Sequence, residues 1–164
     1  MMVYRGDVLP VGALLEHALS APAARPAAAV GVRHTAAGNA ALCAALVAAG
    51  EPPDQGWRFG VLQTLDDYAS TLCRGGPSLA AQVFADEPAP TGCPALDAAF
   101  AALAEHLAGR DGWPAPAWAA DPERRADAWC PDVPAIFRAE AERDSPPAFR
   151  RRGIWITARS LERA

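Results

Sequence analysis

The sequence predicts an all-α protein, a compact multi-helix bundle of roughly six to eight helices with at most one short C-terminal strand. Apolar residues recur at intervals of three and four along most of the 164 residues, and this spacing places them on one face of a helix. Proline and glycine lie between these stretches, where they start and stop helices. Residues 154–157, near the C-terminus, have the β-branched and aromatic composition that is typical of a strand.

The first helices are expected within residues 1–90, the N-terminal helical half. Apolar positions behind Pro10 predict a first helix, and the proline- and alanine-rich residues 20–35 predict a connection. A second helix is expected from about Asn39 to Gly50, because glycine accepts the left-handed conformation that ends many helices.

The third expected helix, which starts near Pro53, has the clearest pattern of the chain. Gly75-Gly76-Pro77 predicts its end, and a short helix carrying Val83 and Phe84 is expected to follow, with Ser78 as its cap. The apolar stripe of the third helix has intervals of four, four, three and four, and consists of Trp57, Val61, Leu65, Tyr68 and Leu72.

Residues 91–164 are expected to form a C-terminal helical half with an arginine-rich terminal segment, or to join the first half in one compact domain. Pro94 predicts the start of a long helix, and Gly109 or Gly112 its end. Prolines within residues 113–118 block a regular helix, so the two indoles there are expected to lie across a neighbouring helix. Further helix openings are expected at Asp121-Pro122-Glu123, Asp132 and Ser145-Pro146-Pro147.

Charge is distributed unevenly along the chain. The net charge is −4, which argues against a globally basic nucleic-acid binder. Residues 138–164 hold seven arginines and four acids, whereas residues 1–137 hold eight arginines and fifteen acids. The arginine-aromatic segment, which we define as Phe149, Arg150, Arg151, Arg152 and Trp155, combines guanidinium groups with rings. Three interpretations stay open for it: docking onto the protein's own acidic helices, binding a partner protein, or binding nucleic acid.

The sequence offers little support for catalysis. It contains no His-Glu-x-x-His, no Gly-x-Ser-x-Gly and no phosphate-binding glycine loop, so neither an enzyme nor a cofactor is expected. Cys43, Cys73, Cys93 and Cys130 lack Cys-x-x-Cys spacing and are expected to be small buried residues. A metal site made of Cys93, His106 and Cys130 is an alternative only if the fold brings them together.

The chain is expected to be cytoplasmic and to make no contact with a membrane. No uninterrupted apolar stretch reaches about 18 residues, the length that a spanning helix needs. The apolar residues 8–15 are not followed by a clean signal-peptide cleavage signature.

The stretch from Gly92 onward contains several elements that together carry a family resemblance. They are Leu96-Asp97-Ala98-Ala99, residues 103–108, residues 114–118, residues 121–124, Trp129, residues 145–156 and Leu161-Glu162-Arg163-Ala164. Together they resemble an uncharacterised family of small helical proteins from GC-rich bacteria, and the resemblance covers a little under half of the chain. Some members of that family lie beside nucleotidyltransferase-like toxins or carry an N-terminal repressor-type domain, so the resemblance implies an antitoxin or regulatory role. It carries over no catalytic residues, and residues 1–90 show no repressor-type domain.

The sequence therefore predicts a soluble protein–protein interaction module, an antitoxin or regulatory partner that neutralises a toxin enzyme through the arginine-aromatic segment. The first alternative is a metal-dependent or small-molecule enzyme with a site assembled from scattered cysteine, histidine and acidic residues. The second is a nucleic-acid-binding regulator. A helix-turn-helix over residues 39–74 is disfavoured, because Asp66 and Asp67 lie in the middle of the would-be recognition helix.

Overall fold

A computed structural model describes residues 10–20, 31–131 and 133–162, and the chain divides into two units, Met1–Gly31 and Val32–Ala164. In the first unit, α1 (Val11–Ser20) begins directly after Pro10, as expected. Asp132, one of the expected helix openings, lies outside the described residues. None of the described helices is both long and apolar enough to cross a membrane.

The second unit is an all-α bundle, which confirms the expected fold class. Within the described residues the one β-type pairing is an isolated parallel bridge between Trp129 and Ile154, which agrees with at most a short C-terminal strand. The α-helices of this unit are α2 (Ala36–Ala48), α3 (Pro53–Gly56), α4 (Leu62–Ala80), α5 (Pro94–Asp111), α6 (Arg138–Asp144) and α7 (Pro147–Arg150). A π-helical turn spans Trp57–Val61, and 3-10 turns span Ala81–Phe84, Ala117–Ala120, Ala135–Phe137 and Ala158–Leu161.

Helix α2 begins three residues earlier than the expected Asn39. The Thr35 side chain accepts a hydrogen bond from Gly38 N at 3.1 Å and so caps the helix at its true start. The expected stop of the third helix at Gly75-Gly76-Pro77 is a kink, because Gly76 has a φ of +73° and helical structure resumes at Pro77.

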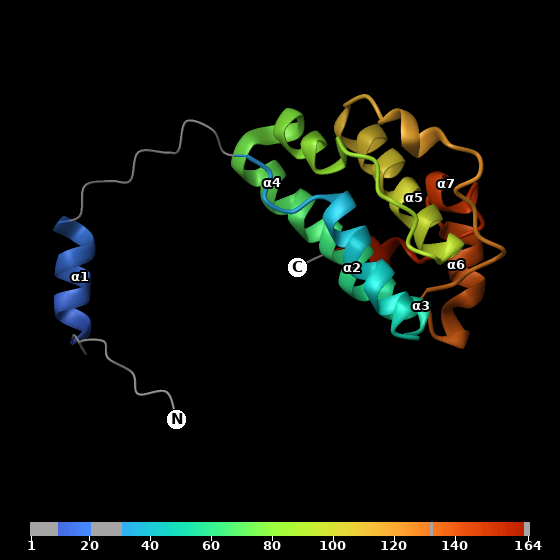
Figure 1. The fold of residues 1–164 in the computed structure, drawn as a ribbon, viewed down its shortest axis with the longest axis horizontal. Coiled ribbons are helices and arrows are strands. Elements are labelled where there is room, and N and C mark those ends of the chain that lie inside the picture. The colour runs from blue at the N-terminus through green and yellow to red at the C-terminus, as the bar shows by residue number, and fades with distance from the viewer. Residues whose placement is uncertain (1–9, 21–30, 132, 163–164) are drawn as a thin grey trace. The chain divides into compact units, whose positions relative to one another are not determined.

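Helix α5 is the centre of the core. Figure 1 shows it with α2 and α4 on one side and α7 on the other. It starts at Pro94 and ends at Gly112, whose φ of +74° is the left-handed conformation expected of a helix stop. Alanines on several faces let the neighbouring helices approach closely, so residues 98–104 are all fully buried.

The two indoles of residues 113–118 pack as the sequence predicts. The ring of Trp113 stacks on that of Phe84, with ring centroids 5.8 Å apart and an interplanar angle of 19°. Trp118 Nε1 donates to the Phe84 carbonyl at 3.1 Å. Residues 113–118 thereby fasten the end of α5 to the Ala81–Phe84 turn.

The expected helix opening at Asp121-Pro122-Glu123 is wrong. Asp121 Oδ1 accepts a hydrogen bond from Glu123 N at 2.9 Å, and this bond closes a local turn. The backbone that follows is not helical. The Arg124 side chain packs inside the protein. Its guanidinium lies over the Trp118 ring and donates to Glu87 and to the Pro88 carbonyl.

The C-terminal segment closes against this turn region. Gly153, with a φ of +73°, ends the turn after α7, as the sequence predicts. Backbone hydrogen bonds then join Trp129 N to the Gly153 carbonyl and Trp155 N to the Trp129 carbonyl, both at 2.8 Å. Residues 121–131 and 152–155 are therefore held side by side although they are distant in the sequence.

Candidate functional site

The arginine-aromatic segment does not lie on one surface. Helix α7 packs against α5, and this contact buries Phe149 completely. The Phe149 ring meets Trp57 edge-on at 6.2 Å and His106 at 6.1 Å. Phe149 is a core residue, so its expected role in partner binding is incompatible with its position.

Arg152 is also internal, with only 7% of its surface exposed. Its guanidinium donates to the backbone carbonyls of Asp121 at 3.3 Å and Arg124 at 3.2 Å, and also to the carbonyl of Ala119. It forms an ion pair with Glu105 of α5 at 3.2 Å. Arg152 therefore braces the C-terminal segment against α5 and residues 119–124, and is not available to a partner.

The other three predicted residues stay accessible. Arg150 is exposed, and Trp155 is half-buried. The Arg151 side chain is 61% exposed and pairs with Glu105. Consecutive residues of a helical turn point about 100° apart, so the side chains of three arginines in a row point in different directions and differ in exposure.

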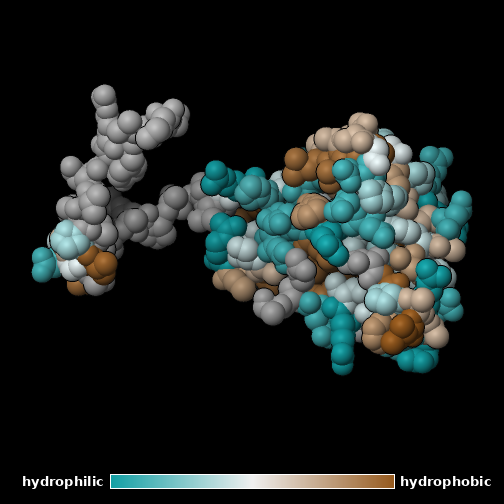
Figure 2. All heavy atoms as spheres, turned by 90° about the horizontal axis from the view of Figure 1, so that it is seen from below, coloured by the Kyte–Doolittle hydropathy of each residue, from teal (hydrophilic) through white to brown (hydrophobic). Residues whose placement is uncertain are grey.

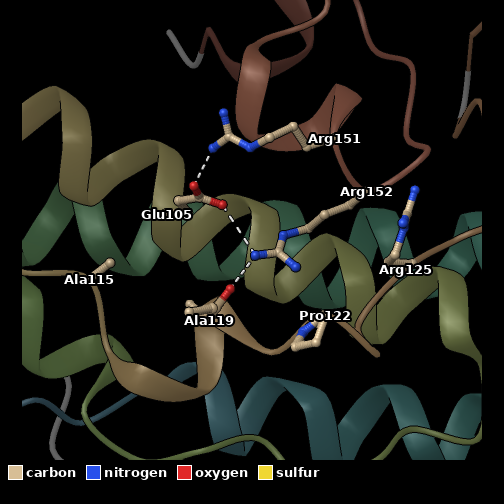
Figure 3. Close-up of a pocket in the computed structure, with 8 residues that line it drawn as sticks. Glu105, Ala115, Ala119, Pro122, Arg125, Arg151 and Arg152 are labelled. Atoms are coloured by element: carbon tan, nitrogen blue, oxygen red, sulfur yellow. Dashed lines mark hydrogen bonds and ion pairs between the residues drawn. The ribbon is translucent and has the colours of Figure 1, made fainter.

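Two adjoining cavities lie where α7 meets α5, and they share Glu105, Ala115 and Arg151. The first cavity, which we call the arginine cavity, has a volume of about 390 Å³. Figure 3 shows its side chains, with Glu105 turned toward the guanidinium groups of Arg151 and Arg152. The second has a volume of about 520 Å³ and is lined by His106, Arg110, Trp113 and Pro147, among others.

A polar network ends beside the second cavity. Trp113 Nε1 donates to the Tyr68 hydroxyl at 2.8 Å, and that hydroxyl donates to Asp111 Oδ2 at 2.6 Å. Burial raises the pKa of Tyr68 to about 12, and the hydrogen bond from Arg110 lowers the pKa of Asp111. Burial, aided by Arg110, lowers the pKa of His106, so arginines supply the positive charge here at neutral pH.

The cysteines do not assemble a metal site. Within residues 10–20, 31–131 and 133–162, no group of three or more histidine, cysteine or acidic side chains could hold a metal ion, and Cys93, His106 and Cys130 do not form one. All four cysteines are free, and only Cys43 is buried as expected. Cys73 is exposed, because it falls one position beyond the apolar stripe of α4 and faces solvent.

This difference predicts a sharp order of thiol reactivity. Cys43 donates to the Gly56 carbonyl at 3.4 Å, and burial raises the pKa of its thiol to about 11. In the folded protein we expect iodoacetamide to modify Cys43 at less than about a tenth of the rate for Cys73. Peptide mapping by mass spectrometry measures both rates, and the denatured chain is the control in which they should converge. Equal rates in the folded chain would contradict the packing of α2.

Sequence reasoning missed two residues of the arginine cavity. Neither Glu105 nor Arg125 is among the site residues that the sequence predicts, although both line this cavity. A lone glutamate on a helix and an arginine in an irregular segment carry no pattern of their own. The one sequence signal is the net positive charge of the C-terminal segment, which favours contact with an acidic helix.

Comparison of the chain with family models, with curated proteins and with solved structures found no match. The residues of the chain itself therefore carry the inference of function.

Proposed function

We propose that this chain is a protein-interaction module that binds a second protein, as the antitoxin or regulatory partner of a toxin enzyme. The observation that carries the proposal is the apolar turn, Ala135–Phe137, in which Ile136 is 80% exposed and Phe137 is 44% exposed. Neighbouring exposed apolar side chains of this size commonly mark a protein–protein contact. Burying Ile136 would contribute about 1.5–3 kcal/mol to association, and burying the rest of Phe137, which is already partly covered, would contribute less.

The surroundings of the apolar turn suit such a contact. Arg138 follows it directly and is exposed, and elsewhere on the surface Arg150, the last residue of α7, and Arg151 are exposed as well. Aromatic and arginine side chains are the residue types that most often supply interface binding energy. On the face drawn in Figure 2, apolar surface lies in separate patches among hydrophilic side chains.

Arg151 is able to exchange partners. Its ion pair with Glu105 is largely solvent-exposed, and exposed pairs of this kind contribute only about 0–1 kcal/mol. A carboxylate of the toxin would replace Glu105 at low cost, while the apolar turn supplies the anchor. In this mechanism the module covers the active site or substrate channel of the toxin.

The test is co-expression with the protein encoded by the adjacent gene, followed by co-purification and by measurement of growth. We expect Ile136→Asp to weaken the complex by at least about tenfold and to restore growth arrest. Leu42→Asp is the matched control, because Leu42 is 59% exposed on α2, and it should bind like the unmodified chain.

Two results would overturn the proposal. One is a chain that neither co-purifies with the neighbouring protein nor relieves growth arrest. The other is an Ile136→Asp variant that binds as tightly as the Leu42→Asp control, since the apolar turn would then have no part in binding.

A further inference from the structure

We propose that the arginine cavity binds the phosphate monoester group of a small organic ligand. The cavity lies between α5, the Ala117–Ala120 turn and the Arg151-Arg152 pair that directly follows α7. The cavity is separate from the apolar turn, because neither Ile136 nor Phe137 lines it, and Arg151 is the residue that the two proposals share.

The first argument is charge. Three guanidinium groups, those of Arg125, Arg151 and Arg152, line the cavity, and Glu105 is its one carboxylate. The lining therefore carries a net charge of +2 by simple subtraction, three positive groups less one negative. A phosphate monoester carries about −1.5 to −2 at neutral pH, whereas a carboxylate carries only −1. The dianion neutralises the cavity, and the carboxylate leaves it positive.

The second argument is that Arg152 is fixed in place before any ligand arrives. Its guanidinium donates hydrogen bonds to backbone carbonyls of residues 119–124 and to Glu105. These bonds keep the positive charge from moving out into the solvent. Its Nε–H is buried and has no acceptor among the residues that the structure describes. A buried donor without an acceptor is costly, so the guanidinium that lines this cavity keeps an unmet demand for an acceptor.

The third argument is that Arg125 and Arg151 have donors to spare. The Arg125 side chain is exposed and has no hydrogen-bond or ion-pair partner within the described part of the chain. Arg151 uses one nitrogen on Glu105 and leaves its others free. In the view of Figure 3 the Arg152 side chain lies between those of Arg151 and Arg125. Three guanidinium groups lining one cavity supply enough donors for the three terminal oxygens of a phosphate monoester.

The size and walls of the cavity indicate an organic phosphate. Its volume of about 390 Å³ falls within the range of about 300–1,000 Å³ that is usual for small-molecule sites. The apolar side of the lining consists of Ala115, Ala119, Ala120 and Pro122, which can contact a carbon skeleton but cannot bind an anion. The phosphate would lie at the arginines and the organic group against these side chains.

The test is calorimetric titration of the full chain at low ionic strength with four probes: phenyl phosphate, inorganic phosphate, benzoate and a single-stranded oligonucleotide without a terminal phosphate. We expect phenyl phosphate to bind at least about tenfold tighter than benzoate, and inorganic phosphate to fall between them. Arg125→Gln should weaken phenyl phosphate by at least about tenfold without altering the unfolding transition, because Arg125 is exposed and unpaired. Arg150→Gln removes the same charge from an exposed arginine outside the cavity and should leave binding unchanged.

Each other outcome overturns the inference. Benzoate binding as tightly as phenyl phosphate would make this a carboxylate site. Tighter binding of a single-stranded oligonucleotide without a terminal phosphate would make it a nucleic-acid contact. Equal losses in the Arg125→Gln and Arg150→Gln variants would reduce it to non-specific attraction, and no heat with any probe would remove the site. None of these results bears on whether the chain binds a toxin.

Discussion

Replacing Gly153 with alanine is expected to lower the free energy of unfolding by about 4 kcal/mol, the sum of backbone strain and a steric clash. The φ of Gly153 is +73°, a conformation that costs an L-residue about 1–2 kcal/mol. A Cβ there would also overlap the carbonyl oxygen of Ala126 and lie 3.1 Å from its carbon. These are backbone atoms, so no side-chain rotation can relieve the overlap.

The clash would open the junction between residues 126–129 and 152–155. Ala126 N donates to the Arg152 carbonyl and Trp129 N to the Gly153 carbonyl, both at 2.8 Å. Each of these hydrogen bonds contributes about 1 kcal/mol to stability, and both would lengthen as the segments separate.

Gly112→Ala is the matched control for Gly153→Ala. Gly112 has nearly the same φ, +74°, but a Cβ at this position would meet no atom within 4 Å. Only the backbone strain applies, so a loss of about 1–2 kcal/mol is expected. Urea unfolding followed by circular dichroism measures both variants against the unmodified chain. If the two losses are equal, the close approach of residues 126 and 153 is not present in solution.

The helices could be predicted from the sequence because the signals that specify them are local. Pro94 and Gly112 bound α5 as expected, and the alternation of three and four positions places the buried Leu96, Phe100 and Leu103 on its inner face. Such patterns need no knowledge of the rest of the chain. The same reasoning failed at Asp121, where a side-chain hydrogen bond to Glu123 N competes with helix formation.

The candidate site could be predicted only in part, because its contacts are long-range. Arg151 and Arg152 are adjacent and of the same residue type, yet Arg151 is exposed and Arg152 is buried. Glu105 pairs with both, so what separates them is the backbone carbonyl of Ala119, 33 positions away, to which Arg152 donates. Charge asymmetry made docking onto the protein's own acidic helices one of three interpretations, and it did not indicate which arginine would be buried.

Arg152→Met is expected to destabilise the protein by about 3 kcal/mol, because it breaks a buried ion pair and leaves polar groups without partners. Methionine keeps an apolar stem of similar length, so the loss reports the guanidinium rather than a cavity. The carbonyls of residues 119, 121 and 124 would lose their donor. Arg151→Met, the matched control, removes an exposed pair with the same Glu105 and should cost less than about 1 kcal/mol.

Comparing the stability of these two variants shows whether Arg152 is an internal brace or part of a docking surface. If Arg152 faced a partner, Arg152→Met would leave the isolated chain as stable as Arg151→Met and would weaken only the complex. If it is a brace, the isolated chain loses stability, and the loss appears in chemical unfolding without any partner present. The burial of Arg152 and its three backbone acceptors favour the brace. Under the proposed function, partner recognition would then depend on the exposed arginines and the apolar turn.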